Sequence, residues 1–372
     1  MEQKEKTRKF SFLVTSLAGS SLSHLTRTLA SHSSDFRYFS RTALTWIVAL
    51  ILEPFRWWEY IRWNRRINKV KIDTPPIFII GFWRSGTTML HNIMCQDPRA
   101  SFVTTYQTVF PNHLFSHSWW FKPIIGLFWP THRPFDDVKM GLDLPQEEEI
   151  ALASLQSVSF YNFMYFPKNF EQSYEEELFL HGLSESRMRK WKKAYIRLIK
   201  QSILNLKGDR FVSKNPSNMA RIKILLEMFP DAKFIFIHRD PYKTVYSFYR
   251  FFAEVVPTIE LQKSSHGLDI EKHVRIYKDL IHQYFQERSL IPDGNLAEVK
   301  FDDFKKDPLA GLEQIYSTLG LDGFKEARPY FEKYQETSSE INHKYEIPRE
   351  TIEMVNREAG DVIEMLGYQR KA

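Results

Sequence analysis

The first residues whose types and spacing could do chemistry form the loop GFWRSGTT, residues 81–88, directly after the apolar run 77–80. Two glycines spaced G-x-x-x-x-G between a strand and a helix let backbone N–H groups bind a phosphate. A nucleotide triphosphatase loop needs a lysine at the next position, but Thr87 stands there and a different cation, Arg84, lies inside the loop. This pattern disfavours ATP. It favours a donor with one 5′-phosphate and a transferable group, because Arg84 could stabilise the bridging oxygen as the bond breaks.

The same loop resembles the 5′-phosphosulfate loop of sulfotransferases, in which the pattern G-x-P-[KR]-[ST]-G-T-T recurs. Trp83 departs from the usual proline, and Arg84 stands where many members have lysine. The resemblance implies the P-loop-like sulfotransferase fold and 3′-phosphoadenosine 5′-phosphosulfate as the donor, with no metal required. Arginine does not give up its proton, so Arg84 would act as a fixed charge. The loop residues assigned to the donor in this way are Arg84, Ser85, Gly86, Thr87 and Thr88.

A second block, HRDPYKTVYSFYRFF, resembles the site that holds the donor's 3′-phosphate in this family. Arg239 would supply charge at the end of a strand, and Ser247 would supply a hydroxyl two helical turns later. Each has a simpler interpretation by itself, as a solvated strand end or an ordinary helix serine. Their occurrence together, after a loop of the matching kind, favours a shared nucleotide site.

Three further stretches resemble the bacterial branch of the family that carries an R-S-G-T-T loop, so that the resemblance covers about residues 76–366. Lys214 matches a K-x-P-x-H motif in which Asn218 replaces the histidine. The stretch VKFDDFKKDPLAGLEQIYSTLGL resembles a late strand and helix. NHKYEIP resembles a C-terminal H-x-Y stretch through His343 and Tyr345.

The reaction that the resemblance implies, transfer of a sulfuryl group to a hydroxyl, needs a base, and the acidic run after Pro145 offers one. Successive helical residues point about 100° apart, so three consecutive carboxylates cannot all face one site. A P-x-E-[DE]-E helix can supply the base in this family, and we place Glu147 and Glu148 before Glu149. The alternative is that these acids only stabilise the dipole of their helix.

A long segment at 111–142 has dense aromatics, several prolines and no clean period, and is expected to be an acceptor-loop insertion over the sheet edge. Its aromatic density favours an apolar acceptor, such as a sterol-like or lipid alcohol or a phenol, over a sugar. His113, Trp119 and Trp129 are the substrate-binding candidates. His113 and His117 are also the second choice for the base.

The elements that must position these residues follow an alternation of apolar strands and helical patterns. Such an alternation predicts an α/β fold with a central parallel β-sheet flanked by helices on both faces. Asp240 suits the cap, and Pro241 the first turn, of the helix that follows the expected strand 232–240. The expected strands are 77–80, 210–214, 232–240 and 295–301, and the last helices are expected from the final strand through Leu319 and near 348–366.

Charge is distributed unevenly: the net charge is +6, yet residues 1–69 carry twelve Lys/Arg and five Asp/Glu. This predicts a basic, Trp-rich helical N-terminal extension at 1–74 on a nearly neutral body. The family resemblance implies that the body, 75–372, is a sulfotransferase domain. The body lacks basic runs interleaved with aromatics, which excludes nucleic acid as a partner. No Cys/His cluster has zinc spacing, and the single Cys95 allows no intrachain disulfide. A reducing, cytoplasmic location fits.

The apolar run 42–52 is too short to span a membrane and is expected to end at Glu53-Pro54. The stretch that follows mixes three tryptophans with four arginines. Two interpretations stay open: a helix docked on the domain with solvated arginines, or an interfacial helix on an anionic membrane. The sequence does not indicate an oligomeric state.

Three other functions fit part of the pattern. The first is a carbohydrate sulfotransferase, which the scarcity of Asp, Asn and Arg in the aromatic segment argues against. The second is an ATP-dependent P-loop kinase with Asp240 as its strand-end acid, which the absent loop lysine argues against. The third is a non-enzymatic membrane or nucleotide-binding module. Vesicle binding without turnover would favour this module, and magnesium-dependent ATP turnover would favour the kinase.

Overall fold

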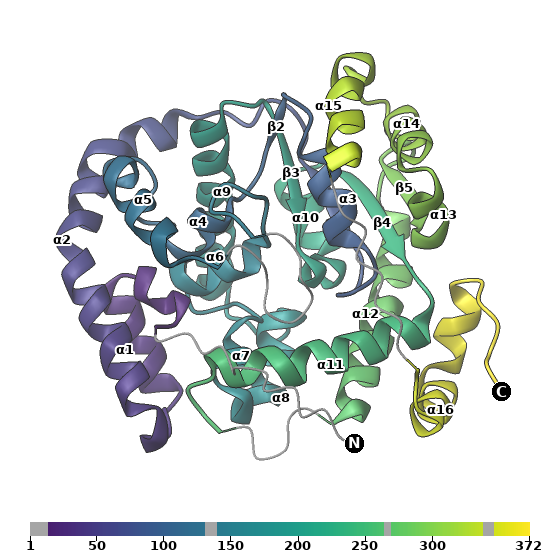
Figure 1. Cartoon of the computed structure of the whole chain (residues 1–372), viewed down its shortest axis with the longest axis horizontal. Helices are drawn as coiled ribbons and strands as arrows, with labels where there is room; N and C mark the ends of the chain where they lie inside the picture. The colour runs from purple at the N-terminus through teal and green to yellow at the C-terminus, as the bar shows by residue number, and fades with distance from the viewer. Residues whose placement is uncertain (1–13, 131–139, 264–268, 338–345) are drawn as a thin grey trace, which may run out of the picture.

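A parallel five-stranded β-sheet forms the centre of the protein in the computed structural model, which describes residues 14–130, 140–263, 269–337 and 346–372 (Figure 1). The strand order is β2-β3-β1-β4-β5, so β1 lies between β3 and β4. The predicted α/β class is confirmed. The strands are β1 (Ile77–Ile80), β2 (Ala100–Ser101), β3 (Arg210–Lys214), β4 (Lys233–His238) and β5 (Leu296–Lys300).

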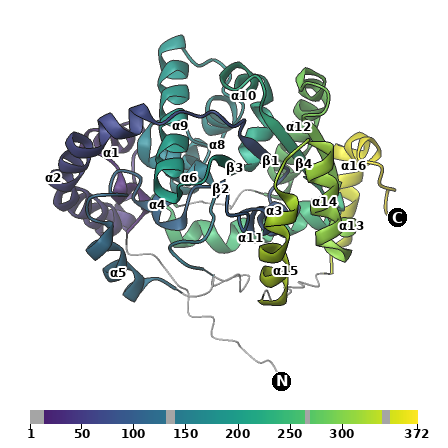
Figure 2. The ribbon, with the colours of Figure 1, turned by 90° about the horizontal axis from the view of Figure 1, so that it is seen from above.

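Every residue of β1 is buried, as expected for a central strand covered on both faces. Alternate side chains point to opposite faces, so Phe78 and Ile80 join one hydrophobic cluster while Ile77 and Ile79 join another. Figure 2 places α3, α14 and α15 on one side of the strands and α10 and α12 on the other. The covering helices are α3 (Thr87–Met94), α9 (Glu185–Leu206), α10 (Ile222–Met228), α11 (Pro241–Ile259), α12 (Ile270–Glu287), α14 (Pro308–Thr318), α15 (Phe324–Thr337) and α16 (Arg349–Met365).

The described part of the N-terminal segment, residues 14–74, is largely helical, as predicted, and packs against the body. Its helices α1 (Leu22–Ser31) and α2 (Phe39–Lys69) lie at the end of the molecule opposite α16 (Figure 1). Leu25 and Ala49 are fully buried in the same hydrophobic cluster as one face of β1. The domain boundary expected after residue 74 stays a prediction.

The apolar run 42–52 ends at Glu53-Pro54 as expected, but the helix that carries it does not, because α2 continues through the proline. A proline removes one backbone hydrogen bond from a helix interior. Tertiary packing outweighs this loss, since Leu52 and Ile67 are buried on either side of Pro54. Among the described residues, no helix is long and apolar enough to cross a membrane.

The helix expected after the last strand is broken into two. The first is α13 (Phe301–Lys306), and Asp307 then caps α14 by accepting a hydrogen bond from the N–H of Ala310 at 3.0 Å. Pro308 occupies the first turn of α14, where its missing N–H costs nothing. A cap and a proline in adjacent positions therefore restart the helix.

The segment 111–142 is not wholly irregular, because it contains helix α5 (Ser118–Phe128). This helix lies beside α2 in both views (Figures 1 and 2). His343 and Tyr345 lie outside the described residues. The remaining short α-helices are α4 (Thr105–Val109), α6 (Glu148–Leu155), α7 (Asn162–Tyr165) and α8 (Phe170–Gln172).

Candidate active site

The glycine loop leaves the carboxyl end of β1 and enters α3. β3 and β4 lie on either side of β1, and in open α/β sheets ligands bind outside the carboxyl ends of strands placed in this way. Gly86 has φ 103° and is the N-cap of α3. A Cβ there would lie 2.0 Å from the ring of Phe301, so only glycine fits. A Cβ on Gly81 would lie 2.3 Å from the carbonyl oxygen of Ile237. The two glycines thus hold the loop against β4 and α13.

The loop is fixed to the sheet by Ser85, whose Oγ donates to the carbonyl oxygen of Ile237 at 3.1 Å. Thr87 and Thr88 are the first residues of α3, so their backbone N–H groups belong to the unpaired first turn of a helix. A helix N-terminus with free N–H groups and a favourable dipole suits a 5′-phosphate.

Arg84 and Ser247, predicted from blocks 163 residues apart, meet in the structure. The Nε of Arg84 donates to the Oγ of Ser247 at 3.0 Å, and its guanidinium lies 5.5 Å from the ring centroid of Phe251. Arg84 has φ 68°, a left-handed conformation that is uncommon for a residue with a side chain. The loop backbone and α11 together set the direction of this cation.

Arg239 directly follows β4 and stacks with its guanidinium 5.0 Å from the ring centroid of Phe301. The buried Nε of Arg239 and the Oγ of Thr244 have no hydrogen-bond partner among the described residues. Both residues line a narrow crevice together with Ser85 and Tyr277. Buried donors without a partner are rare in folded proteins, so these two donors are candidates to bind an anionic group such as a phosphate, although the crevice as it stands has no room for one.

The acidic run lies at the start of α6, where its three carboxylates have different surroundings. Glu147 is the N-cap residue, and its side chain is 21% exposed. Its Oε1 accepts a hydrogen bond from the buried Nζ of Lys214 at 2.6 Å, at the carboxyl end of β3. Glu147 is therefore a partly exposed carboxylate held by a fixed cation.

Glu148 is fully buried. Its Oε1 accepts from the backbone N–H of Lys214 at 3.1 Å, while Oε2 has no hydrogen-bond partner among the described residues. Burial raises the pKa of Glu148 to about 8. The side chain thus holds a proton at neutral pH and ties α6 to β3.

Glu149 forms a buried ion pair with Arg221, whose Nη1 and Nη2 donate to its two oxygens at 2.8 and 3.1 Å. Burial alone would raise the pKa of Glu149, but the charge and hydrogen bonds of Arg221, with Asn215, hold it below its usual value. The sequence analysis did not single out Arg221. The feature that could have indicated a buried, paired arginine is its position inside a stretch of apolar residues, between Met219 and Ile222.

His113 and His117 are packed against α2. Burial, together with the nearby charges of His117 and Arg56, lowers the pKa of His113 to about 3. The Nε2 of His117 lies 3.1 Å from the carbonyl oxygen of Phe55. Neither histidine lines the hollow described next, and the structure does not bring either one to the pair of Glu147 and Lys214.

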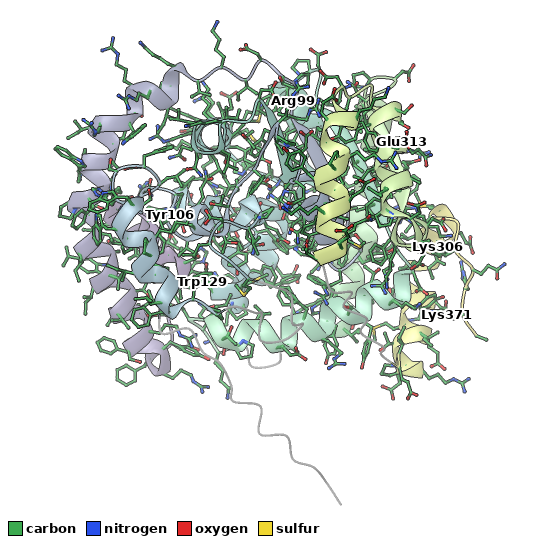
Figure 3. All side chains as sticks on the ribbon, turned by 45° about the horizontal axis from the view of Figure 1, so that its top comes forward. Arg99, Tyr106, Trp129, Lys306, Glu313 and Lys371 are labelled. Carbon is green, nitrogen blue, oxygen red and sulfur yellow. The ribbon has the colours of Figure 1, made fainter. Side chains whose placement is uncertain are left out.

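Trp119 and Trp129 border a surface hollow of about 460 Å³ beside α5. Figure 3 shows Trp129 on the same side of the molecule as Tyr106 of α4. Asp143, the last lining residue of the hollow along the chain, lies four residues before Glu147. Four residues of extended chain span at most about 14 Å, so Glu147 lies within that distance of Asp143. The lining residues are Ser118, Trp119, Lys122, Pro123, Gly126, Trp129, Pro130, Met140, Gly141, Leu142 and Asp143.

Residues 75–326 match the sequence profile of the Sulfotransferase family, which is more than half of the chain. The chain belongs to this family. The omega-hydroxy-beta-dihydromenaquinone-9 sulfotransferase Stf3 of Mycobacterium tuberculosis is 33% identical to this sulfotransferase over 321 residues. The match covers 84% of this chain and 80% of that protein, and Stf3 of Mycobacterium bovis gives the same values.

Two solved structures share the fold of this sulfotransferase. STF9 of Mycobacterium avium superposes with a TM-score of 0.67 at 17% identity, over 89% of this chain and 86% of that chain. STF1 of Mycobacterium tuberculosis gives 0.62 at 17% identity, over 91% of each chain. The predicted P-loop-like sulfotransferase fold is confirmed, and the protein is a 3′-phosphoadenosine 5′-phosphosulfate-dependent sulfotransferase. Within the described ranges, no three His, Cys, Asp or Glu side chains form a cluster that could hold a metal.

Proposed function

We propose that this sulfotransferase transfers the sulfuryl group of 3′-phosphoadenosine 5′-phosphosulfate to the hydroxyl of an apolar lipid alcohol. The observation that carries the proposal is the hollow bordered by Trp119 and Trp129, whose wall runs within four residues into Glu147. Apolar walls suit a hydrocarbon chain, and a few polar groups at one end suit a hydroxyl. The name of Stf3 specifies a hydroxylated dihydromenaquinone as its acceptor, which supports the same class of molecule.

For the donor, we assign the 5′-phosphosulfate to the first turn of α3 and to Arg84. The 3′-phosphate is assigned to Arg239, whose buried Nε has no partner among the described residues, and to Ser247, which is in contact with Arg84 of the loop. Arg84 contacts Ser247, so one network would hold both ends of the nucleotide. As the bond between sulfur and the bridging oxygen breaks, Arg84 would stabilise the negative charge that develops on that oxygen.

For the acceptor, we assign the base to Glu147. Its carboxylate would take the proton of the acceptor hydroxyl while the acceptor oxygen forms its bond to sulfur and the bond to the donor oxygen breaks. Lys214 would hold the carboxylate in place, since its Nζ is buried and already donates to Glu147. Glu148 is completely buried and protonated at neutral pH, so we give it a positioning role at the backbone of Lys214.

The test is a transfer assay with ³⁵S-labelled donor and a panel of acceptors dispersed in detergent: a long-chain prenyl alcohol, a sterol, a simple phenol and a monosaccharide. We expect kcat/KM for the prenyl alcohol or the sterol to exceed that for the monosaccharide by at least about 10²-fold, because only the apolar chains fill the hollow. A higher kcat/KM for the monosaccharide would overturn the acceptor class and leave a carbohydrate sulfotransferase.

A further inference from the structure

The exposed apolar side chains of the protein are concentrated at one end. Of the eighteen large apolar side chains exposed among the described residues, fifteen lie between residues 36 and 61 or on α5. The exceptions are Leu290, Tyr330 and Met365. Single exposed apolar residues are ordinary, but a contiguous group of this size marks a surface that meets another apolar phase.

The outer face of α2 is apolar over about six helical turns. Ile47, Ile51 and Ile61 are 50%, 61% and 73% exposed, although the opposite face of the same helix is buried in the protein. Trp57 and Trp58 are about half exposed on this outer face. A helix that docks with one face and presents isoleucine and tryptophan on the other has two apolar faces, and only one of them is covered by this chain.

α5 extends this surface. None of its eleven residues is fully buried, and Leu127 and Phe128 are 81% and 83% exposed. The helix lies beside α2, where the rings of Trp120 and Phe55 meet at 5.9 Å (Figures 1 and 2). We call the exposed residues of α2 and α5 the α2–α5 face. The hollow bordered by Trp119 opens beside it.

The exposed charged residues of the α2 part of this face carry a single sign of charge, and the exposed Asp143 beside α5 is paired with Lys122. Arg62, Arg65 and Lys69 are exposed at the end of α2. Residues 36–69 are all described, and within them Glu59 is buried while Glu53 is partly buried and paired with Arg56, so no carboxylate is exposed. Aromatic rings with arginines beside an apolar surface are typical of the boundary between lipid headgroups and acyl chains.

We propose that the α2–α5 face docks this sulfotransferase on the surface of a bilayer that contains anionic phospholipids, with the hollow opening toward the lipid. The apolar side chains would enter the boundary between headgroups and acyl chains, and the arginines would contact the phosphates. The docking rests on exposure and charge alone. Only its consequence, that the acceptor alcohol enters from the bilayer, rests on the proposed function.

A second copy of the chain is a less suitable occupant. In a symmetric dimer the same face would meet itself, and the arginines at the end of α2 would find no exposed carboxylate on the partner's α2, while Asp143 beside α5 is already paired with Lys122. An anionic bilayer supplies both the apolar phase and the negative charge. We therefore commit to the bilayer.

The experiment is flotation of the full-length protein with vesicles of phosphatidylcholine alone and of phosphatidylcholine with phosphatidylglycerol in a two-to-one ratio, without donor or acceptor. We expect the protein to float with the anionic vesicles. The double variant Ile61→Glu with Leu127→Glu should lower the partition coefficient at least about tenfold. The double variant Arg62→Glu with Arg65→Glu should lower it by about tenfold or more on anionic vesicles and far less on phosphatidylcholine alone.

Matched controls carry the same chemical changes at the other end of the molecule. Leu290→Glu with Tyr330→Glu repeats the apolar change, and Lys325→Glu with Lys333→Glu repeats the change of charge, at exposed positions. Both controls should float like the wild type. Unchanged binding of the donor product adenosine 3′,5′-bisphosphate would verify that each variant is folded.

Absence of flotation by the folded wild type would overturn the proposal, as would equal losses in the variants and their controls. Sedimentation equilibrium that shows a dimer, dissociated by Ile61→Glu with Leu127→Glu and not bound to vesicles, would assign the face to a second copy instead. Transfer to a detergent-dispersed prenyl alcohol is measured separately. If flotation persists while that transfer is absent, the docking stands and the proposed function fails. If that transfer occurs while flotation is absent, the proposed function stands and the docking fails.

Discussion

At the scale of single residues, the contact between Arg84 and Ser247 joins the two blocks assigned to the donor. Because Arg84 lies inside the loop that would bind the 5′-phosphosulfate, we expect Arg84→Ala to lower kcat by about 10²–10³-fold, with a smaller change in the Kd of adenosine 3′,5′-bisphosphate. Arg84→Lys should keep part of the activity. Steady-state kinetics and calorimetry provide the measurements.

The control for this prediction is Lys207→Ala. Lys207 also has a left-handed φ, 62°, but it caps α9 at the surface, so it tests the effect of the backbone conformation alone. If Arg84→Ala changed only the Kd of the nucleotide and left kcat intact, Arg84 would be a binding residue without a part in the bond-breaking step.

The assignment of the base predicts a difference between two adjacent carboxylates. Glu147→Gln should lower the single-turnover rate by about 10²–10⁴-fold with donor bound, because the proton acceptor is lost. Glu148→Gln should keep a substantial part of the rate, because an amide can still accept from the backbone N–H of Lys214. His113→Ala and His117→Ala serve as the comparison. A dead histidine variant with an active Glu147→Gln would return the base to the 111–142 segment.

The buried carboxyl of Glu177 predicts how stability depends on pH. Burial raises the pKa of Glu177 to about 8 from a usual 4.5. Between these values the folded protein keeps a proton that the unfolded chain has lost, so its contribution to stability falls as pH rises, by at most about 1.4 kcal/mol per pH unit. Glu177→Gln should flatten the decline in Tm between about pH 5 and pH 8. The exposed Glu326→Gln should not, and equal slopes for both variants would contradict the prediction.

At the scale of elements, α2 has an inner and an outer face whose roles differ. Ala49 is fully buried and the adjacent Leu50 is 49% exposed, so the same substitution tests both faces. Ala49→Glu should destabilise the protein by several kcal/mol, on the order of 3 or more, because it buries an unpaired charge, whereas Leu50→Glu should leave the free energy of unfolding nearly unchanged. Denaturant unfolding measures both. Equal effects would mean that α2 does not share the core of the body.

Helix α2 also bears on the proposed division into an extension at 1–74 and a sulfotransferase domain at 75–372, because it belongs to the extension and contacts the domain. Glu59 of α2 accepts hydrogen bonds from the N–H groups of Phe115 and Ser116 at 2.7 and 2.6 Å. Residues on both sides of the proposed boundary therefore share hydrogen bonds as well as a hydrophobic cluster. We expect the two parts to unfold together as one cooperative unit.

At the scale of the whole molecule, the proposed route of the acceptor runs from the surface hollow to the start of α6. Trp129→Ala should raise the KM for a lipid alcohol by about tenfold, with little change in the Kd of adenosine 3′,5′-bisphosphate, because a wall of the hollow is lost while the donor loop is untouched. The exposed Tyr330→Ala on α15 is the control. An unchanged KM in the Trp129 variant would place the acceptor elsewhere.

The sequence by itself determined the local features that the physics of short segments controls. The continuous apolar runs identified β1 and β4, because a strand covered on both faces is apolar along its interior. The shorter and less regular patterns at 210–214 and 295–301 indicated β3 and β5, and β2 was not predicted. The glycine spacing located the loop between β1 and α3. The structure gives the physical reason for one of these glycines, because Phe301 lies so close to Gly86 that a side chain would not fit. Asp240 and Pro241 marked the start of α11, where the cap bond from the N–H of Lys243 forms.

Only the tertiary structure decided what depends on neighbours from distant parts of the chain. The three glutamates after Pro145 are equivalent in the sequence, but Lys214 holds the first, burial keeps the second protonated and Arg221 pairs with the third. Helix α2 passes through Pro54 because packing of its inner face outweighs one lost hydrogen bond. Burial and charge pairing are properties of the folded neighbourhood. A pattern of local periodicity and propensity does not contain them.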